Sequence, residues 1–191
     1  MTDAGGGASS LIERRRRAVG IVGAAVLVLV AVVLAIVGSD GGSDLEAAST
    51  ELRIVSPEGL AELEDDLGHA VYWAGERPPA RIEMKQEANG SVFLRYLAPG
   101  VAVGNDLAGY LTVGTYPVTD AAAATRRFAR GAGTRPLAGP DGSIVVPNPD
   151  SAGSVYFAYP DSDLQIEVFD PAPGRALGLI RAGEIKPVGE G

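Results

Sequence analysis

A run of twenty residues, 18–37, contains no charged or strongly polar side chain. Four consecutive arginines, at 14–17, stand directly before it. About 20 apolar residues in a helix span the hydrocarbon core of a bilayer, and arginines on one flank hold that flank in the cytoplasm. Half of the run is β-branched, but a segment in lipid must be helical because no water satisfies its backbone amides. The sequence therefore predicts a single transmembrane helix at 18–37, with the lipid bilayer as its partner.

The arginines also set the orientation of the predicted helix in the cell membrane. A short cytoplasmic tail, 1–17, precedes the helix, and the C-terminal remainder is extracytoplasmic. The alternative is a cleaved secretory signal, with Val37 and Ser39 as the small residues before cleavage at Asp40. The apolar region of such a signal is usually about 7–15 residues long, so the length of this run favours an uncleaved anchor. In both cases the remainder is exported.

Small residues recur four positions apart within the run, at Gly20 and Ala24 and again at Ala31 and Ala35. Such spacing lets two helices approach closely in lipid. A dimer through the predicted span is therefore a further hypothesis, although segments rich in alanine and glycine also produce this spacing by chance.

Charge is divided unevenly along the chain. Residues 1–17 hold four arginines against two acids, a net charge of +2, so the residues after them carry −10 of the total of −8. A negatively charged exported part argues against binding to nucleic acid or to an anionic membrane face. Cysteine is absent, which excludes disulfides, thiol catalysis and cysteine–zinc sites. Stability must therefore come from a hydrophobic core.

The exported part divides by composition into a tether and a domain. Residues 38–55 begin with a polar, glycine-rich stretch, and we interpret them as a tether. A flexible tether of this length holds the following domain about 20–25 Å from the membrane on average. Residues 56–188 are long enough to bury one core, so we expect a single extracytoplasmic domain there.

The first predicted element of this domain is a helix over 57–67. Ser56 is its N-cap, Pro57 occupies its first position and Gly68 ends it, while leucines at helical spacing form its buried face. The other face carries four acids, and no calcium-loop spacing surrounds them. We therefore interpret them as a solvated acidic face. These acids are Glu62, Glu64, Asp65 and Asp66.

A weak internal repeat gives the best indication of the fold. Residues 89–96 resemble residues 152–159, and each copy lies after one predicted strand and before a second strand and a helix. Asn89 and Gly90 form a turn pair that readily adopts the positive φ of a tight hairpin. The predicted halves are 81–131 and 143–183, with helices at about 120–130 and 174–182.

The predicted fold class is α+β, with a mainly antiparallel sheet and two or three short helices after the N-terminal single transmembrane helix. Two ββα-like pseudo-repeats explain the internal similarity, and the β propensity shared by strand-forming segments is the alternative explanation. We expect the helices of the two halves to cover one face of the sheet. The residues expected to do so are Ala121, Ala124, Phe128, Ala176, Leu177 and Ile180.

Motifs for catalysis or cofactor binding are not found in the sequence. His69 is the only histidine, which argues against a serine–histidine–acid triad and against a histidine metal centre. No phosphate-binding glycine loop is present, so we assign no catalytic residue, metal ligand or cofactor. A pair of carboxylates can cleave glycosidic bonds without any of these. Four acids cluster near the C-terminus, although a turn and the outward face of a strand explain them equally: Asp161, Asp163, Glu167 and Asp170.

Three groups of residues are candidates for ligand binding. Tyr72 and Trp73 are adjacent in a predicted strand and so point to opposite faces, which exposes one ring if the other is buried. The long loop at 98–109 is of the kind that often carries recognition residues. Basic residues in the last turn of the helix at 120–130 fit an anion or the helix dipole. The loop and helix candidates are Asn105, Asp106, Arg126, Arg127 and Arg130.

The composition, rich in Ala, Gly, Val and Arg, is typical of a bacterium with a GC-rich genome. We therefore expect a membrane-anchored extracytoplasmic binding or interaction domain of the bacterial cell envelope, whose partner is an envelope protein or a wall polymer. The alternative is a membrane-anchored hydrolase of an envelope polymer that uses paired carboxylates. A hydrolase requires two carboxylates about 5–10 Å apart in one cleft, whereas an interaction domain presents an apolar or aromatic surface.

Overall fold

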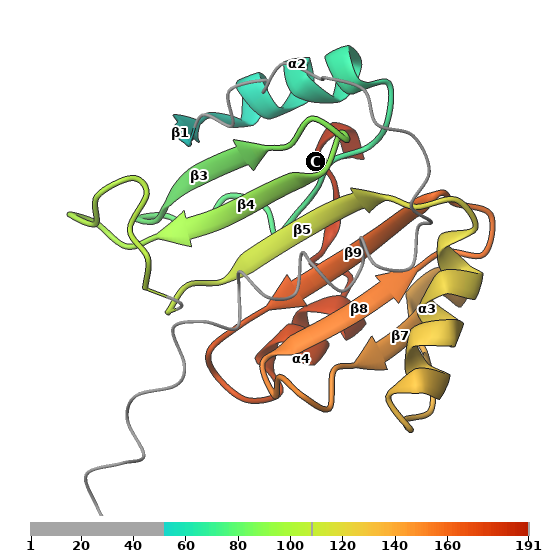
Figure 1. Cartoon of the computed structure of the whole chain (residues 1–191). Coiled ribbons are helices and arrows are strands. Elements are labelled where there is room, and N and C mark those ends of the chain that lie inside the picture. The colour runs from blue at the N-terminus through green and yellow to red at the C-terminus, as the bar shows by residue number, and fades with distance from the viewer. Residues whose placement is uncertain (1–51, 108, 191) are drawn as a thin grey trace, which may run out of the picture. The chain divides into compact units, whose positions relative to one another are not determined.

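A computed structural model describes residues 52–107 and 109–190. These residues form an α+β structure with three α-helices and a mainly antiparallel sheet, which confirms that part of the predicted fold class (Figure 1). Residues 52–105 and 109–190 belong to one compact unit, which does not include Asp106 and Leu107. Within the described ranges, no helix combines the length and the apolar character needed to cross a membrane. The predicted span at 18–37 and the cytoplasmic tail at 1–17 lie outside the described residues.

The main sheet consists of two antiparallel meanders that meet at its centre. Strands β3–β4–β5 form one meander and β7–β8–β9 the other, and they are joined by antiparallel pairing of β5 with β9, in which Thr112 lies opposite Phe169. The short strands β1 and β6 complete the two edges. In spatial order the strands are β1 (Arg53–Val55), β3 (Arg81–Gln86), β4 (Val92–Leu97), β5 (Thr112–Pro117), β9 (Leu164–Phe169), β8 (Ser154–Ala158), β7 (Ile144–Pro147) and β6 (Leu137–Ala138).

Each meander is followed in the chain by a helix, as the sequence predicts for the two halves. Helix α3 (Ala121–Gly131) follows β5, and helix α4 (Arg175–Arg181) follows β9. The two segments that resemble each other in sequence form β4 and β8, which are the middle strands of the two meanders. The sequence similarity therefore coincides with equivalent places in the topology.

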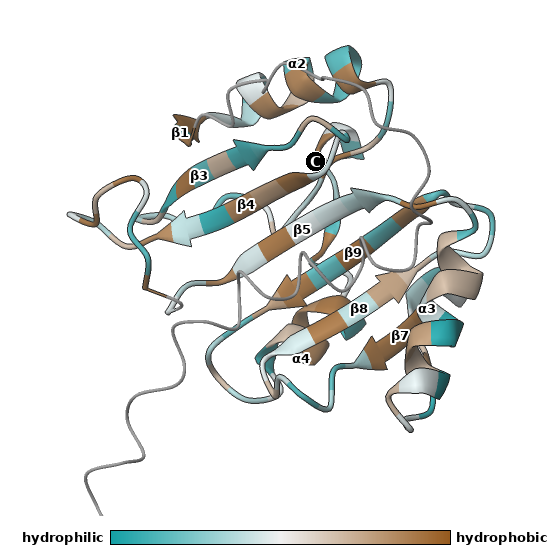
Figure 2. Ribbon diagram, in the orientation of Figure 1, coloured by the Kyte–Doolittle hydropathy of each residue, from teal (hydrophilic) through white to brown (hydrophobic). Residues whose placement is uncertain are grey.

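The main core lies on one face of the sheet. It contains side chains from helix α2 (Pro57–Leu67), from α4 and from β2 (Tyr72–Trp73), a short strand that pairs with β10 (Lys186–Pro187) in a separate two-stranded sheet. The strand β2 is fixed over the sheet because Tyr72 N donates to Thr115 Oγ1 at 3.0 Å. Figure 2 shows hydrophobic segments that alternate with more hydrophilic ones along β4, β8 and β9, while hydrophilic residues mark the outer side of α2.

The prediction that α3 and α4 cover the same face of the sheet is wrong. Ala122 and Ala129 of α3 pack with Ile144 and Val146 in a second cluster, whereas Val145 belongs to the main core together with residues of α4. Successive residues of a strand point to opposite faces. The apolar run in β7 is therefore buried on both sides, and each side needs its own cover. Figure 1 shows the two helices on opposite sides of β7–β9.

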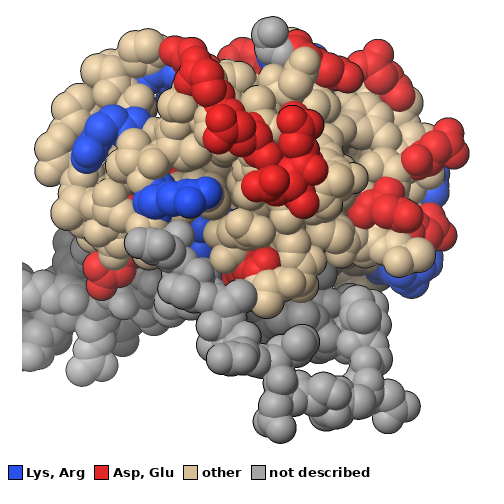
Figure 3. Space-filling view, turned by 90° about the horizontal axis from the view of Figure 1, so that it is seen from above, with Lys and Arg blue, Asp and Glu red and all other residues tan. Residues whose placement is uncertain are grey.

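Helix α2 has the bounds predicted from its capping residues. The Ser56 Oγ accepts a hydrogen bond from Gly59 N at 3.2 Å, and Gly68 ends the helix with a positive φ of 68°. Glycine adopts the left-handed conformation at this position with little strain because it has no Cβ. The exposed acids of the helix contribute to the acidic surface seen from above in Figure 3.

One member of the predicted acidic face of α2 has a different role. The Glu64 carboxylate accepts hydrogen bonds from three backbone N–H groups: Val71 at 2.6 Å, Val188 at 3.2 Å and Gly189 at 3.0 Å. It therefore fixes the C-terminal segment against α2 instead of facing solvent alone. The partners at 188 and 189 are more than 120 positions away in the chain, so helical periodicity cannot reveal them.

The predicted tether at 38–55 is too long at its C-terminal end. Residues 53–55 form β1, in which Arg53 lies opposite Met84 and Val55 opposite Ile82. Three residues are too few for a visible alternation of apolar and polar side chains, and this strand forms because β3 offers it an unpaired edge. The part of the predicted tether before residue 52 lies outside the described residues.

Candidate functional site

The prediction of an exposed ring at Tyr72 or Trp73 is wrong. The two side chains are 7% and 6% exposed. Tyr72 makes an edge contact with Phe157 and stacks on Tyr159, with ring centroids 6.0 Å and 6.3 Å apart. The strand β2 is not part of the main sheet, and both of its residues belong to the main core together with side chains of the sheet, α2 and α4. Both of its side chains are therefore covered.

The other predicted binding residues do not form one site. Arg126, Arg127 and Arg130 are exposed on α3, and within the described residues none of them forms an ion pair. The backbone oxygen of Asn105 accepts a hydrogen bond from Arg95 Nη1 at 2.7 Å, so this residue helps to hold its loop.

Two further residues from the sequence analysis are placed as follows. Asp106 is exposed, and it lies outside the compact unit. The ring nitrogens of His69 lie 3.0 Å from the Ala70 oxygen and 3.2 Å from the Gly90 oxygen, which ties the end of α2 to the β3–β4 hairpin. The histidine thus has a structural place in the domain.

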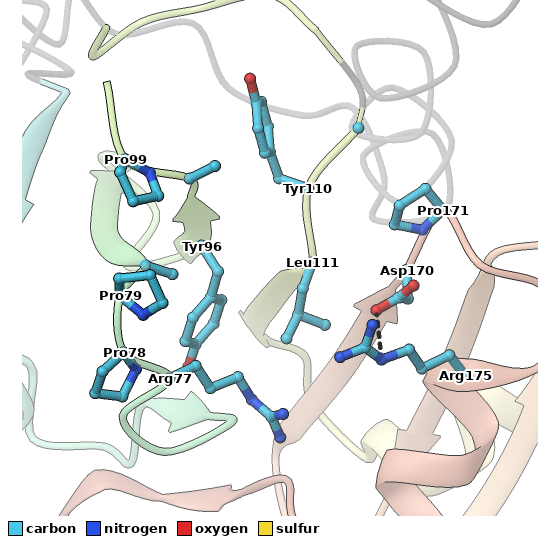
Figure 4. Close-up of a pocket in the computed structure, with 13 residues that line it drawn as sticks. Arg77, Pro78, Pro79, Tyr96, Pro99, Tyr110, Leu111, Asp170, Pro171 and Arg175 are labelled. Carbon is cyan, nitrogen blue, oxygen red and sulfur yellow. Dashed lines mark ion pairs between the residues drawn. The ribbon is translucent and has the colours of Figure 1, made fainter. Parts of the chain in front are cut away.

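A pocket of about 550 Å³ lies where the C-terminal ends of β4 and β9 meet the beginning of β5. This volume is within the range of about 300–1,000 Å³ that is usual for small-molecule sites. The segment before β3 and the first residue of α4 close two of its sides, as Figure 4 shows. The lining residues are Arg77, Pro78, Pro79, Ala80, Tyr96, Ala98, Pro99, Gly109, Tyr110, Leu111, Asp170, Pro171 and Arg175.

Rings and aliphatic groups form most of the pocket wall. The Tyr96 ring is held in place because its hydroxyl oxygen accepts a hydrogen bond from Ala74 N at 2.7 Å. In Figure 4 Tyr110 lies across the pocket from Pro99, and Leu111 lies between the tyrosines and Asp170. Aromatic and proline rings present flat apolar surfaces at little cost in side-chain entropy.

Two guanidinium groups reach the same pocket from different elements. Arg77 Nε donates to the Ala74 oxygen at 3.0 Å, and Arg77 Nη2 pairs with the Glu184 carboxylate at 2.6 Å. Arg175, the first residue of α4, lies with Nε 3.4 Å from Asp170 Oδ2. In Figure 4 the two guanidinium groups point toward the same part of the pocket.

Asp170 contributes the carboxylate of the pocket, and both of its oxygens have partners. Oδ1 accepts from Ala172 N at 2.8 Å, and Oδ2 faces Arg175. The side chain is nearly buried, with 4% of it exposed. The carboxylate therefore positions the turn into α4 and the Arg175 side chain. The negative charge of the carboxylate is paired with the Arg175 guanidinium.

Burial also determines the protonation state of the phenol in the wall. Desolvation raises the pKa of Tyr96 to about 12, because the buried phenolate would lose its hydration, while the Ala74 hydrogen bond and Arg77 oppose this increase. The Tyr96 hydroxyl is therefore protonated throughout the physiological range and remains a hydrogen-bond donor.

The four C-terminal acids proposed as paired carboxylates are separated from one another by the structure. Asp163 Oδ1 accepts from Asp120 N at 2.8 Å in the turn before α3. Glu167 lies opposite Gly114 in the middle of the sheet and does not line the pocket. Asp161 is exposed in the β8–β9 turn. Asp170 is thus the single carboxylate among the described residues that line the pocket.

Glu167 belongs to a second polar cluster. It accepts hydrogen bonds from Tyr116 Oη, at 2.8 Å, and from Ser154 Oγ. Burial raises the pKa of Tyr116 and of Tyr156, and the negative charge of Glu167 raises both further. The Tyr116 ring lies directly over Gly114, where a Cβ would come within 2.9 Å of the hydroxyl oxygen. Glycine at 114 therefore permits the contact between the phenol and the carboxylate.

Sequence reasoning missed most of the pocket residues. It considered Asp170 as a catalytic acid but did not identify Arg77, Tyr96, Tyr110 or Arg175. The available signal was a proline just after β4, just after β9 and twice before β3, at Pro99, Pro171 and Pro78-Pro79. That signal cannot be recognised without knowing that these strand ends adjoin.

Metal binding receives no support from the described residues, where no three acidic or histidine side chains come close enough together to hold an ion. Comparisons with protein-family models, with curated proteins and with solved structures found no match to this chain.

Proposed function

We propose that this chain is a membrane-anchored extracytoplasmic binding protein of the bacterial cell envelope and that its ligand binds in the pocket between Arg77, Tyr96 and Arg175. The observation that carries the proposal is the composition of the pocket wall. Tyrosine, proline and leucine side chains supply contact area, and a few polar groups supply orientation. This division of roles is typical of small-molecule binding sites.

The placement of the carboxylates favours a binding role over hydrolysis. Glycoside cleavage requires one acid to donate a proton and a second to attack or to activate water, with both in one cleft. The described part of the pocket contains Asp170, which is engaged by Ala172 N and Arg175. We therefore put the hydrolase of an envelope polymer aside in favour of a binding role.

The membrane location of this proposal depends on the sequence. The apolar run at 18–37, the arginines at 14–17 and the negative charge of the remainder support a single-pass protein with its N-terminus in the cytoplasm. The partner is then an envelope component, either a protein or part of a wall polymer, and a dimer through the small residues of the span is compatible with this arrangement.

We also infer that the two meander–helix units are pseudo-repeats. Two observations support this inference: the resemblance of residues 89–96 to 152–159, and the position of these segments in the middle strands β4 and β8. In this interpretation the pocket joins the ends of strands from both units.

Cysteine labelling tests both the location and the site, because the natural chain contains no cysteine. Ala98→Cys places a thiol at the exposed wall of the pocket, and Glu62→Cys places one on the exposed face of α2 as the matched control. A membrane-impermeant maleimide is added to intact cells, and the modification rate of each variant is compared with its rate in purified protein.

The proposal predicts that both thiols are modified in intact cells. It also predicts that the thiol at position 98 reacts more slowly in native membranes than after purification, while the thiol at position 62 reacts equally in the two states. Modification of the position 62 thiol only after lysis would contradict the location. Equal rates at position 98 in the two preparations would contradict occupancy of the pocket by an envelope component.

A further inference from the structure

Arg77, Tyr96 and Arg175 bring hydrogen-bond donors to the pocket. Arg77 has five N–H groups and, among the described residues, uses Nε for Ala74 and Nη2 for Glu184. The Arg175 guanidinium faces Asp170 through Nε, and its side chain is 58% exposed. The Tyr96 oxygen accepts from Ala74 N, and within the described residues its own proton has no acceptor.

The carboxylate of the pocket, by contrast, already has partners. Both oxygens of Asp170 are engaged, by Ala172 N and by Arg175. A neutral polar ligand would need acceptors from the protein for its own N–H or O–H groups, and a cationic ligand would need an uncompensated carboxylate. An oxyanion accepts hydrogen bonds without donating any, so it complements the donors that remain.

The charge of the pocket agrees with this pattern. Arg77 and Arg175 against Asp170 and Glu184, the ion-pair partner of Arg77, give a formal charge of zero, although the whole chain carries −8. Charged groups in a concave, partly desolvated site focus their field on the ligand, whereas the exposed acids elsewhere are screened by salt. A pocket without net negative charge, lined by two guanidinium groups, therefore admits an anion that the net charge of the chain would disfavour.

We infer that the pocket binds a small molecule in which a carboxylate or phosphate group is attached to a ring. The oxyanion lies between the guanidinium groups of Arg77 and Arg175 and accepts the Tyr96 proton, and the ring packs on the tyrosine and proline wall. This inference rests on the proposed function, because it names the ligand class of the same pocket.

Ligand-observed NMR with three matched probes tests the inference on the full chain in dodecyl maltoside, a detergent without phosphate. Benzyl phosphate, benzyl alcohol and benzylamine share one ring and differ in charge. Benzyl phosphate is expected to bind at least about 10-fold more tightly than the other two, because hydrogen bonds to a charged group are stronger than those between neutral groups. Benzoate is expected to follow benzyl phosphate.

Arg175→Gln is the pocket variant, and Arg130→Gln, which removes an equal charge from the exposed face of α3, is its control. Arg175→Gln is expected to weaken benzyl phosphate about 10-fold or more and to leave benzyl alcohol unchanged, while Arg130→Gln changes neither. Tyr96→Phe, which removes only the hydroxyl, is expected to weaken benzyl phosphate by a smaller factor. The fluorescence of Trp73, the single tryptophan, verifies that each variant is folded.

The outcomes separate this inference from the function on which it rests. Equal binding of benzyl phosphate and benzyl alcohol, with binding of both abolished by a bulky Ala98→Phe change, would overturn the oxyanion inference and leave the pocket as a binding site. No binding of any probe would overturn both. Equal weakening by Arg175→Gln and Arg130→Gln would overturn the inference as well, because bulk charge would then explain the preference.

Discussion

The ion pair of Glu83 with Arg95 allows a quantitative test of how the interior of this domain is built. The Glu83 side chain is 1% exposed and that of Arg95 is 20% exposed, and Nη2 lies 2.5 Å from Oε1. The two residues are directly opposite each other on β3 and β4. Gly104 N donates to the second Glu83 oxygen at 2.6 Å, so both carboxylate oxygens have donors.

Removal of the arginine is expected to cost more than removal of the carboxylate charge. Arg95→Met leaves a buried carboxylate with one backbone donor, and breaking such a pair typically costs about 3–5 kcal/mol. Glu83→Gln keeps an oxygen near its donors and leaves an arginine that can reach solvent, so the expected cost is about 1–2 kcal/mol. In the double variant the coupling energy should recover roughly 1.5–3 kcal/mol of the sum.

Urea unfolding of the full chain in detergent measures these free energies. Trp73 is the only tryptophan and is 6% exposed, so its fluorescence reports the described domain. Equal costs for Arg95→Met and Glu83→Gln, or additive costs in the double variant, would refute the reasoning that an uncompensated buried charge dominates. A common loss below about 1 kcal/mol would show that the pair is solvated, as surface pairs are.

The other predictions concern the same unfolding assay. Glu64→Gln is expected to cost about 2 kcal/mol, because it removes charge from an oxygen pair that serves three backbone N–H groups, while the exposed Glu62→Gln costs less than about 0.5 kcal/mol. Gly153→Ala is expected to cost about 1–3 kcal/mol because its Cβ would collide with the backbone oxygen of Asp170. Gly178→Ala has open space around it in α4 and is expected to be neutral or stabilising by up to about 1 kcal/mol. Because burial raises the pKa of Tyr96 to about 12, its contribution is fully present below pH 10, the unfolded value, and is lost as the pH rises from 10 through 12. Unfolding midpoints between pH 8 and pH 11.5 should therefore fall less steeply in Tyr96→Phe than in the natural chain, and parallel curves would contradict this expectation.

Elements specified by neighbouring residues could be predicted from the sequence. Helix α2 has its cap, its proline and its terminal glycine within thirteen positions, and these signals identify both ends. The β3–β4 hairpin follows from Asn89 and Gly90 between two apolar runs. Local hydrogen bonds and backbone preferences determine such features, and they are complete within one window of sequence.

Features that depend on distant partners could not be predicted. The strand β1 exists because β3 has an unpaired edge. Glu64 differs from its acidic neighbours through hydrogen bonds from Val71 and from the distant residues 188 and 189. The placement of α3 and α4 on opposite faces follows from the double-sided burial of β7, which a short apolar run does not distinguish from single-sided burial. The pocket requires four separate strand ends or turns to meet.

These distant contacts change the roles that we assign to the charged residues. Paired carboxylates were the alternative hypothesis from the sequence, but the partly buried carboxylate of Glu64 and the buried carboxylates of Glu83 and Asp170 all accept hydrogen bonds from backbone N–H groups. These hydrogen bonds hold loops and the C-terminal segment in place. Arg77 and Arg175, which no motif identified, keep N–H groups without acceptors in the described part of the pocket. Carboxylates that hold backbone segments, together with arginines that keep unused N–H groups, favour the proposed binding of an anion. Catalysis by carboxylates would instead require two acids that face a ligand in one cleft.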